Sequence, residues 1–478
     1  MSNGPQGARR HELRARLGLL TAVALVIGSM IGSGIFKKTA VMARELHSTG
    51  LVLTAWVLAG LVTLAGALTN AEIASLIPAT GGQYVYFRRM YGDFVAYLYG
   101  WSVFSVIQTG SIASIAYVFA EYIGYFVPLP RLPPAWEAVS LSLGSTITFT
   151  PFVEIGEKLL AVATILLLTG VNVRGVAFGG VVQNVFTMLK LGAVGVVVAL
   201  AFGSGHGAVA TLGSAGTAPP PTGLLPLCAA MGLALSGAFW AYDGWNNVTY
   251  VASEIREPQR NVPRALVTGT LVVIGVYLVT NLAFLYVLPL GRIEGSKLVA
   301  ADVARECVGW GGGALVAAGV AVSTFGSANG STLASARVGF AMARDGLFFK
   351  RVGAVHGRFG TPHVSLLAQG LWASLLVFSG TFDQLTDMLI FVSWGFYAAG
   401  AAGVFVLRRT MPDAPRRFRV PGYPVLPAIF VLFATAYVVV SLVGSPRNSL
   451  VGLLLVGVGI PPYLWWRRRT RKEAGAAA

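Results

Sequence analysis

A long apolar segment near the start of the chain is interrupted by small residues whose backbone could bind a charged molecule. The interruption reads GSMIGSGIF and lies within the apolar stretch 18–43. If the helix unwinds there, the N–H groups around Ser33 and Gly34 begin a second half-helix, whose partial positive charge suits a carboxylate. Carbonyls near Met30 end the first half and suit an ammonium group, so one break could bind both ends of a zwitterion. The candidate residues of this break are Ser29, Met30, Ile31, Gly32, Ser33 and Gly34.

Small residues at this spacing also have a second interpretation. Gly28 and Gly32 are four residues apart, as are Ser29 and Ser33. Small residues at that spacing often let two membrane helices pack closely. A second break elsewhere in the chain would favour binding over packing.

The segment SGAFWAYDGWNNV contains such a second interruption, with Gly237 and Gly244 on either side of two aromatic residues and one acidic residue. Interruptions at corresponding places in two halves of a hydrophobic chain indicate a substrate site near the middle of the membrane. Unwound backbone at that depth must face protein or a cavity. The aromatic residues could cover a bound side chain, although aromatics in membrane helices more often pack or face lipid. The candidate residues of this break are Trp240, Ala241, Tyr242 and Asp243.

Two ionisable residues lie within apolar spans, where an unpaired charge costs about 2.5–3.5 kcal/mol. Asp243 could hold a cationic side chain, take part in proton movement or hydrogen-bond the unwound backbone. Lys190 has apolar sequence on both sides, so its ammonium needs acceptors inside the bundle. It could replace a sodium ion by bridging carbonyls of the first break and the eighth span; pairing with an unidentified carboxylate is the alternative. The eighth span offers Ser323, Thr324, Ser327 and Asn329 as partners.

The composition predicts a membrane-spanning framework for these residues. The chain of 478 residues is 55% hydrophobic and 11% charged, with a mean hydropathy of +0.70, whereas soluble domains carry about 25% charged residues. The pattern of apolar runs and breaks predicts an all-α integral membrane protein with twelve transmembrane helices. The predicted spans are 18–43, 50–76, 93–125, 155–172, 179–202, 225–250, 264–290, 309–343, 364–380, 384–407, 424–442 and 449–466.

The first ten spans divide into two sets of five, each beginning with an interrupted helix. This arrangement predicts a 5+5 inverted-repeat core, with helices 1 and 6 broken. We therefore divide the chain into an N-terminal tail (1–17), a transport core (18–407), helices 11 and 12 (408–466) and a C-terminal tail (467–478). Most of the 35 Lys and Arg residues fall in loops on one side. By the positive-inside rule that side is the cytoplasm, and it holds both termini.

Nothing in the sequence predicts catalysis, a cofactor or a metal site. Cys228 and Cys307 are the only cysteines and form no metal motif. The glycine-rich break lacks the preceding strand and the following Lys-Ser/Thr of a phosphate loop. The placement of the basic residues explains the net charge of +16 without a nucleic acid partner. Glu72, near the inner end of the second span, is expected to be a structural hydrogen-bonding group or a gate partner.

Four ordered motifs resemble those of a known family. They are GSMIGSGIF, NAEIASLIPATGGQYVYFRRMYG, FWAYDGWNNVTYVASEIREPQRNVPRAL and STFGSANGSTLASARVGFAMARDG. With them the chain resembles the amino acid–polyamine–organocation superfamily and, within it, the L-type amino acid transporter family. The resemblance implies a substrate carboxylate at the amides of Ser33 and Gly34, and an amine at the carbonyls of Met30 and residues 240–243. It also implies that Trp240 is the aromatic gate and that Lys190 is the fifth-helix lysine of sodium-independent members.

The resemblance further implies a sodium-independent amino acid exchanger of the plasma membrane that works by alternating access. A proton-coupled uptake permease is the alternative, and a non-transporting amino acid receptor is a third interpretation. Asp243 stands where several large-neutral carriers have glycine, and it resembles relatives that accept cationic as well as neutral amino acids. Animal members bind a heavy chain through a cysteine between spans three and four. Residues 126–154 contain no cysteine, so no disulfide-linked heavy chain is expected.

Overall fold

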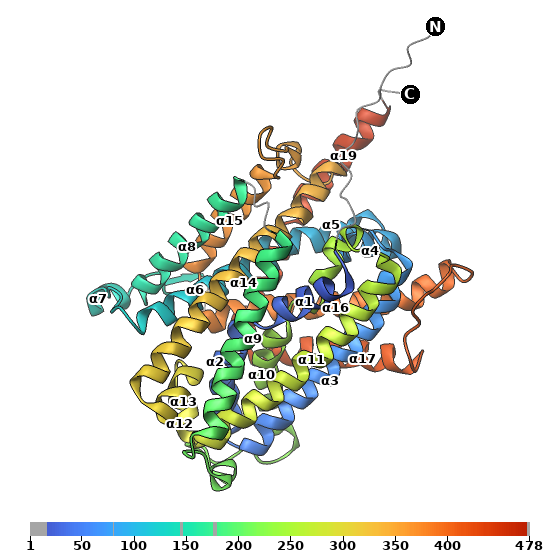
Figure 1. Cartoon of the computed structure of the whole chain (residues 1–478). Coiled ribbons are helices and arrows are strands. Elements are labelled where there is room, and N and C mark those ends of the chain that lie inside the picture. The colour runs from blue at the N-terminus through green and yellow to red at the C-terminus, as the bar shows by residue number, and fades with distance from the viewer. Residues whose placement is uncertain (1–16, 80, 144–146, 175–178, 476–478) are drawn as a thin grey trace.

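The computed structural model describes residues 17–79, 81–143, 147–174 and 179–475, with the backbone alone at 143, 147–148, 179–184 and 468–475. Long helices packed side by side make up most of this part of the chain (Figure 1). The α-helices are α1 (Leu19–Met30), α2 (Ser33–Leu46), α3 (Thr49–Leu76), α4 (Gln83–Tyr91), α5 (Asp93–Ser102), α6 (Gln108–Gly124), α7 (Pro134–Glu137), α8 (Ile155–Val173), α9 (Gly179–Gly203), α10 (Leu224–Tyr242), α11 (Pro258–Val287), α12 (Leu290–Gly295), α13 (Val299–Val308), α14 (Trp310–Arg344), α15 (His363–Val377), α16 (Phe382–Thr410), α17 (Val425–Gly444), α18 (Pro446–Gly457) and α19 (Ile460–Gly475). The remaining elements are a π-helical turn η1 (Val103–Ile107), the 3-10 helices η2 (Val209–Gly213), η3 (Trp245–Glu254) and η4 (Lys350–Gly353), and the antiparallel strands β1 (Leu141–Leu143) and β2 (Ile147–Phe149).

Within the described ranges, 11 helical segments are long and apolar enough to cross a membrane. They coincide with all the predicted spans except the ninth. There the structure has α15, which begins after Pro362 and has 15 residues, fewer than the ~20 that a full crossing needs. The all-α membrane fold is therefore confirmed, whereas the count of twelve spans is not.

Both predicted breaks are present in the structure. The first separates α1 from α2 at residues 31–32, and the second separates α10 from η3 at residues 243–244. Two glycines that helped to predict the breaks lie within regular helix instead: Gly28 is in α1 and Gly237 is in α10. The unwound stretches are therefore shorter than the glycine pattern indicated.

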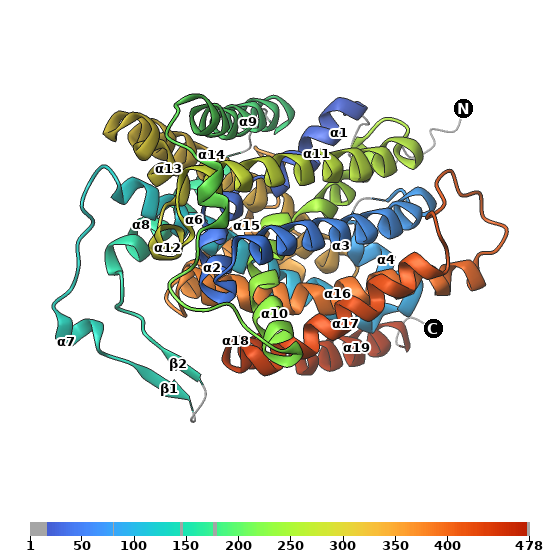
Figure 2. The same ribbon diagram turned by 90° about the horizontal axis from the view of Figure 1, so that it is seen from below.

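Other helices surround the interrupted ones. α1 packs against α9 and α11, while α2 packs along α10, which also contacts α3 and α16. In Figure 2, α3 lies between α11 and α17, and the hairpin of β1 and β2 projects from one end of the bundle. The neighbouring helices shield the unwound backbone from lipid, as such backbone requires.

Glu72 of α3 fastens the loop between α16 and α17 at the end of the bundle predicted to be cytoplasmic. Its carboxylate accepts hydrogen bonds from Arg408 Nε and Nη2 at 2.8 and 2.7 Å, and from the Val420 N–H at 2.8 Å. Arg416 Nε lies 3.4 Å from the same carboxylate. Glu72 is only 1% exposed, and these contacts agree with the first of the two roles predicted for it, a structural hydrogen-bonding group.

The structure describes most of the predicted C-terminal tail but little of the predicted N-terminal one. Residues 1–16 lie outside the described part of the chain, so the N-terminal tail is not described beyond Leu17. The predicted C-terminal tail begins at residue 467, yet α19 continues as helix to Gly475. The last span thus extends beyond its apolar portion, through the basic run that follows it.

Candidate substrate site

The first break leaves backbone donors at the start of α2. Gly32 has φ −134° and ψ −142°, outside the helical region, and α2 begins at the next residue, Ser33. Helix geometry leaves the first N–H groups of α2 without intrahelical acceptors, and the helix dipole adds partial positive charge there. The Ser33 hydroxyl is fully buried, and its oxygen has no hydrogen-bond partner among the described residues. These donors match a carboxylate ligand.

The second break approaches the first so closely that it depends on two glycines. Gly244 has φ +93°, and a Cβ atom there would lie 2.9 Å from the Ser29 carbonyl oxygen. A Cβ atom at Gly34 would lie 2.5 Å from the Cα of Ala241. Any larger residue at either glycine would push the two breaks apart.

Tyr277 of α11 joins the two breaks, and the sequence analysis missed it. Its hydroxyl oxygen lies 2.7 Å from the Met30 carbonyl and 2.8 Å from the Ala241 carbonyl, so it can donate to either. These are two of the carbonyls expected to bind a substrate amine, so an amine must share them with Tyr277. A tyrosine within an apolar span gave no clear signal in the sequence.

A small cavity of about 30 Å³ lies between the breaks. Its lining residues are Ser29, Met30, Gly32, Ser33, Gly34, Gln108, Ser111, Ile115, Trp240, Asp243, Gly244, Asn247, Ser327 and Ser331. Gln108 and Ser111 come from the third span, directly after the π-helical turn η1. π-helical turns inside α-helices are frequent at functional sites. The sequence analysis missed both residues, although polar side chains in an apolar span were a usable signal.

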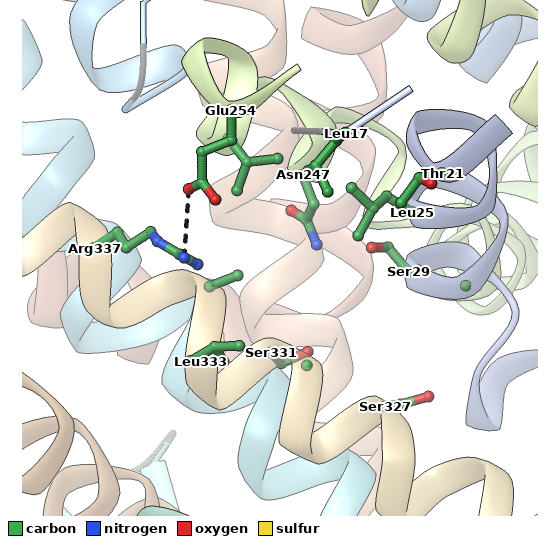
Figure 3. Close-up of a pocket in the computed structure, with 14 residues that line it drawn as sticks. Leu17, Thr21, Leu25, Ser29, Asn247, Glu254, Ser327, Ser331, Leu333 and Arg337 are labelled. Atoms are coloured by element: carbon green, nitrogen blue, oxygen red, sulfur yellow. Dashed lines mark ion pairs between the residues drawn. The ribbon is translucent and has the colours of Figure 1, made fainter. Parts of the chain in front are cut away.

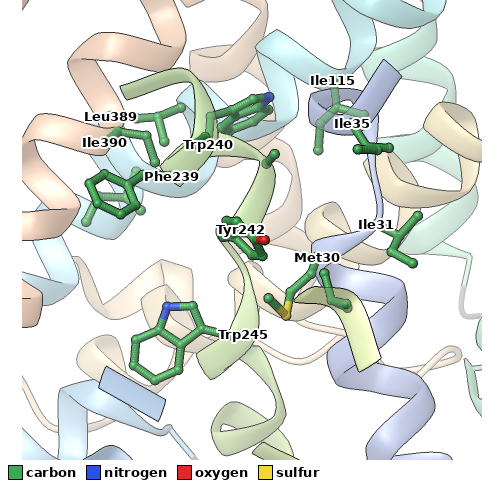
Figure 4. Packing of buried hydrophobic residues seen from close by; sticks show 14 of the residues in the cluster. Met30, Ile31, Ile35, Ile115, Phe239, Trp240, Tyr242, Trp245, Leu389 and Ile390 are labelled. Carbon is green, nitrogen blue, oxygen red and sulfur yellow. The ribbon is translucent and has the colours of Figure 1, made fainter. Parts of the chain in front are cut away.

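The aromatic and acidic residues of the second break divide between two faces. Trp240 and Asp243 line the cavity, and the Asp243 Oδ1 atom accepts a 2.7 Å hydrogen bond from the Tyr397 hydroxyl of α16. Tyr242 instead points toward α3, where its hydroxyl donates to the Trp56 carbonyl at 3.3 Å. Figure 4 shows Trp240 and Tyr242 in the last turn of α10, with Met30 nearby.

Three of the candidate residues therefore do not line the cavity. Tyr242 was expected to cover a bound side chain, but it packs edge-on against Trp56 and beside Tyr277, with ring centroids 5.8 and 5.0 Å away. Ile31 and Ala241 are buried, and neither lines the cavity. In the last turn of α10, neighbouring residues point in different directions, so Trp240 lines the cavity whereas Ala241 and Tyr242 do not.

Lys190 of α9 contacts both elements that the sequence analysis proposed for it. Its Nζ atom donates to the Gly28 carbonyl at 2.8 Å and to the Ser327 hydroxyl at 2.7 Å, and its side chain is 1% exposed. Gly28 lies in the last turn of α1, where the helix end is partially negative. Of the other expected partners, Thr324 donates within α14, Asn329 accepts from Asn172, and the Ser323 hydroxyl has no hydrogen-bond partner among the described residues.

A second cavity of about 140 Å³ continues from the first toward the predicted cytoplasmic end. Four residues line both: Ser29, Asn247, Ser327 and Ser331. Its walls come from α1, η3 and α14, as Figure 3 shows. Across it, Arg337 Nη2 lies 3.4 Å from the Glu254 carboxylate, so this ion pair lies beside the path between the breaks and that end.

The opposite side of the small cavity is covered by aromatic rings and charged residues. The Trp240 ring meets Phe382 edge-on, with centroids 6.0 Å apart. The ammonium groups of Lys37 and Lys38 both lie 4.5 Å from the centre of the Phe382 ring. We call this layer, formed by Lys37, Lys38, Trp240 and Phe382 with their acidic partners, the outer cover. Both lysines lie within α2, inside the predicted span 18–43, and Lys38 is fully buried.

Ion pairs connect the outer cover to two other helices. Lys37 Nζ lies 2.5 Å from the Glu121 carboxylate of α6. Lys38 Nζ donates to Asp383 and to the Thr386 hydroxyl of α16, each at 2.7 Å. These partners allow the two lysines to lie inside the bundle.

A helical membrane bundle in which two unwound helices enclose a polar cavity has the architecture of a solute transporter. The chain belongs to the amino acid permease family, whose model matches residues 17–460.

The chain is similar along most of its length to several characterised relatives. It is 30% identical to the b(0,+)-type amino acid transporter 1 of Mus musculus over 91% of this chain and 84% of the relative. It is 29% identical to the serine/threonine exchanger SteT of Bacillus subtilis over 96% of this chain and 98% of the relative. The large neutral amino acids transporter small subunit 2 of Mus musculus is 31% identical over 96% of this chain and 83% of the relative. These similarities agree with the family resemblance of the four motifs.

Proposed function

We propose that this protein is a sodium-independent amino acid transporter that exchanges neutral and cationic L-amino acids by alternating access. Family membership supports amino acid transport. The name of the Bacillus subtilis relative supports exchange, because that protein is a serine/threonine exchanger. The residues of the two breaks supply the recognition chemistry.

The substrate's common backbone is proposed to bind between the two breaks. Its carboxylate would accept hydrogen bonds from the free N–H groups at Ser33 and Gly34 and from the Ser33 hydroxyl, which has no partner among the described residues. Its amine would donate to the carbonyls of Met30 and Ala241, beside Tyr277. All amino acids carry these two groups, so the side chain would be selected by the rest of the cavity.

Asp243 is proposed to extend selectivity to cationic side chains. Its carboxylate lines the small cavity, and one oxygen accepts from Tyr397. A carboxylate has two oxygens and about four acceptor positions, so Tyr397 leaves room for an ammonium or guanidinium group. The neighbouring Gln108 and Ser111 offer hydrogen bonds to polar neutral side chains.

The proposal of sodium independence rests on the contacts of Lys190. In transporters with broken helices, half-helix carbonyls commonly coordinate the coupling cation. At this point in the present chain, Lys190 Nζ donates to the Gly28 carbonyl and the Ser327 hydroxyl. A permanently tethered ammonium would connect α1, α9 and α14 without a free ion.

The two cavities support alternating access. The polar space continues from the breaks toward the predicted cytoplasmic end, while the outer cover closes the other side. We propose that Trp240 and the outer cover move aside to admit substrate from outside. The protein would lie in the plasma membrane with both termini in the cytoplasm, and without a disulfide-linked heavy chain.

Proteoliposomes with defined contents would test the transport mechanism. We expect labelled amino acid to accumulate only when unlabelled amino acid is inside, and to do so equally well in sodium and in choline buffers. A strict sodium requirement would contradict the proposed role of Lys190. Uptake into empty vesicles would contradict exchange.

A proton-coupled permease is the second candidate, because Asp243 and Tyr397 place a half-buried carboxylate and a buried hydroxyl beside the cavity. The same vesicles distinguish it. Uptake driven by an imposed pH gradient, with no internal amino acid, would favour symport. Binding without any accumulation would favour a receptor over both.

A further inference from the structure

A basic cavity of about 420 Å³ lies at the predicted cytoplasmic end, away from the substrate site. Residues of α11 form one wall, and the loop between α16 and α17 forms the other. The lining residues are Gln259, Arg260, Pro263, Arg264, Arg417 and Phe418. None of them lines the two cavities at the helix breaks. Three arginines around one cavity make it a candidate site for an anion.

Two of these arginines lack an acidic partner. Arg264 and Arg417 are exposed, and within the described ranges no carboxylate forms an ion pair with either. Arg260 has only a loose partner, the Glu257 carboxylate at 3.6 Å, and its side chain is 52% exposed. Guanidinium groups bind phosphate oxygens with paired hydrogen bonds, so the cavity offers two unused phosphate donors.

The loop that carries Arg417 is held in place on both sides. The preceding Arg416 lies 3.4 Å from Glu72, whose carboxylate also accepts from the Val420 N–H at 2.8 Å. The carbonyl of Phe418 accepts a hydrogen bond from the Ser75 hydroxyl at 3.3 Å. Binding an anion would therefore not require ordering of the loop, and less free energy would be lost on binding.

The arginines of α11 stand at the end of a stripe that faces outward along the helix. Arg264 is followed at helical spacing by Leu271, Val279 and Leu282, which are 50, 46 and 37% exposed. The loop that carries Arg417 leads into α17, whose first residue, Val425, is 61% exposed. In a membrane these apolar side chains contact acyl chains, so the cavity lies where a lipid headgroup meets its hydrocarbon.

We propose that this cavity binds the phosphate group of an anionic membrane lipid, whose acyl chains lie along the exposed stripe of α11. Arg264 and Arg417 would hold the phosphate from opposite walls, with Arg260 at the rim. Basic pockets between transmembrane helices on the cytoplasmic side commonly bind such headgroups. A free phosphate ion would use the same arginines but would gain nothing from the apolar stripe.

Native mass spectrometry of the full-length detergent-solubilised protein tests this proposal. The protein is incubated with phosphatidylglycerol or with phosphatidylcholine of the same acyl chains. We expect the wild type to retain phosphatidylglycerol at least about fivefold better. The double variant Arg264→Gln, Arg417→Gln should lose that preference, because each arginine supplies a charge to the headgroup. Equal retention of the two lipids by the wild type would overturn the proposal.

The matched control is Arg419→Gln, which changes an exposed arginine of the same loop outside the cavity lining. Arg419→Gln should keep the wild-type preference for phosphatidylglycerol. If it loses that preference as the double variant does, the lipid is attracted by a diffuse positive surface, and the proposed site is overturned. Excess inorganic phosphate should not displace the lipid, and displacement would show a phosphate-ion site instead. If the double variant does not fold, lipid retention is measured with the single variants Arg264→Gln and Arg417→Gln instead. Unchanged lipid preference in both singles would also overturn the proposal.

Discussion

Lys190 is a single charge placed where three membrane helices meet. It lies on α9 and donates to the last turn of α1 and to α14, with 1% of its side chain exposed. Because an unpaired ammonium at this depth is costly, the two acceptors stabilise Lys190 in its apolar surroundings. Its position connects the first break to a helix that lines the cytoplasmic path.

We predict that Lys190→Ala lowers the turnover number by about tenfold or more, since it removes a charge-assisted hydrogen bond worth about 1.5–3 kcal/mol. Exchange is measured in proteoliposomes at equal protein content. The matched control is Lys158→Ala, which removes another buried lysine that donates to two carbonyls, those of Thr150 and Pro151. Equal losses in the two variants would show that Lys190 contributes only to folding.

Asp243 combines a cavity-facing carboxylate with a hydrogen bond from Tyr397. We predict that Asp243→Asn weakens competition by arginine and lysine about tenfold, because it removes the charge, while leucine changes little. Competition against one labelled neutral amino acid measures both effects. Asp345→Asn is the control, because Asp345 also accepts a tyrosine hydroxyl, that of Tyr84, but lies outside both cavities. An equal loss for neutral and cationic amino acids would show that Asp243 does not contact the side chain.

The residues that the sequence could identify were those whose chemistry is unusual for a membrane. Lys190 and Asp243 stood out because charges are costly there, and the structure brings Ser327 to Lys190 as that reasoning required. Tyr277 was missed because its role depends on a hydroxyl that reaches two backbone carbonyls in three dimensions. Tyr242 was overrated because its direction depends on helical phase, which a short motif does not fix.

At the scale of elements, the two half-helices α2 and α10 must lie almost in backbone contact. A Cβ atom on Gly34 would come within 2.5 Å of the Cα of Ala241, well inside normal packing distance. The glycine therefore serves the approach of two elements as well as the start of α2. The alternative of a packing face was based on Gly28, Gly32, Ser29 and Ser33, whereas the close approach to Ala241 is made by Gly34.

We predict that Gly34→Ala weakens substrate binding by about tenfold or more, because separating the breaks by even 1 Å misplaces the groups proposed to bind the substrate. Gly275→Ala is the control, since a Cβ atom at Gly275 in α11 would meet nothing within 4 Å. Substrate affinity is measured by scintillation proximity on purified protein. Wild-type affinity in Gly34→Ala would mean that the breaks can relax without loss of the site.

Element boundaries were predictable where composition changes sharply, as at α8, which was predicted for 155–172 and spans Ile155–Val173. The predicted boundaries were wrong where tertiary contacts determine how a helix begins or changes its geometry. The third span carries a π-helical turn at Val103–Ile107 that no apolar pattern reveals. The α16 helix begins at Phe382 with a capping box between Thr381 and Gln384, so its first turn extends further than hydrophobicity indicated.

Across the whole molecule, the cavities and the outer cover describe one state of an alternating cycle. Polar space reaches from the breaks toward the predicted cytoplasmic end, while two lysines of α2 pair with acids on α6 and α16 on the other side. These ion pairs join α2, which carries the donors proposed to bind the substrate carboxylate, to two helices around it. Breaking them should favour the state open to the outside.

We predict that Lys38→Met shifts the protein toward that outward-open state. The substitution removes charge-assisted hydrogen bonds to Asp383 and Thr386, worth about 1.5–3 kcal/mol each, which changes the ratio of two conformations by about tenfold or more. Ser331→Cys, on the path between the two cavities, reports this ratio in a Cys228→Ser background. A bulky thiol reagent added from the predicted cytoplasmic side should label it more slowly once Lys38 is replaced.

The control for this measurement is Lys297→Met, because Lys297 pairs with Glu154 at 3.0 Å, is 70% exposed and lies outside the outer cover. It should leave the labelling rate unchanged. Asp383→Asn should slow labelling as Lys38→Met does, since both remove the same ion pair. Unchanged or faster labelling in both outer-cover variants would show that these charges stabilise the fold without biasing the direction in which the site opens. A contact that is equally strong in both conformations does not change their relative populations.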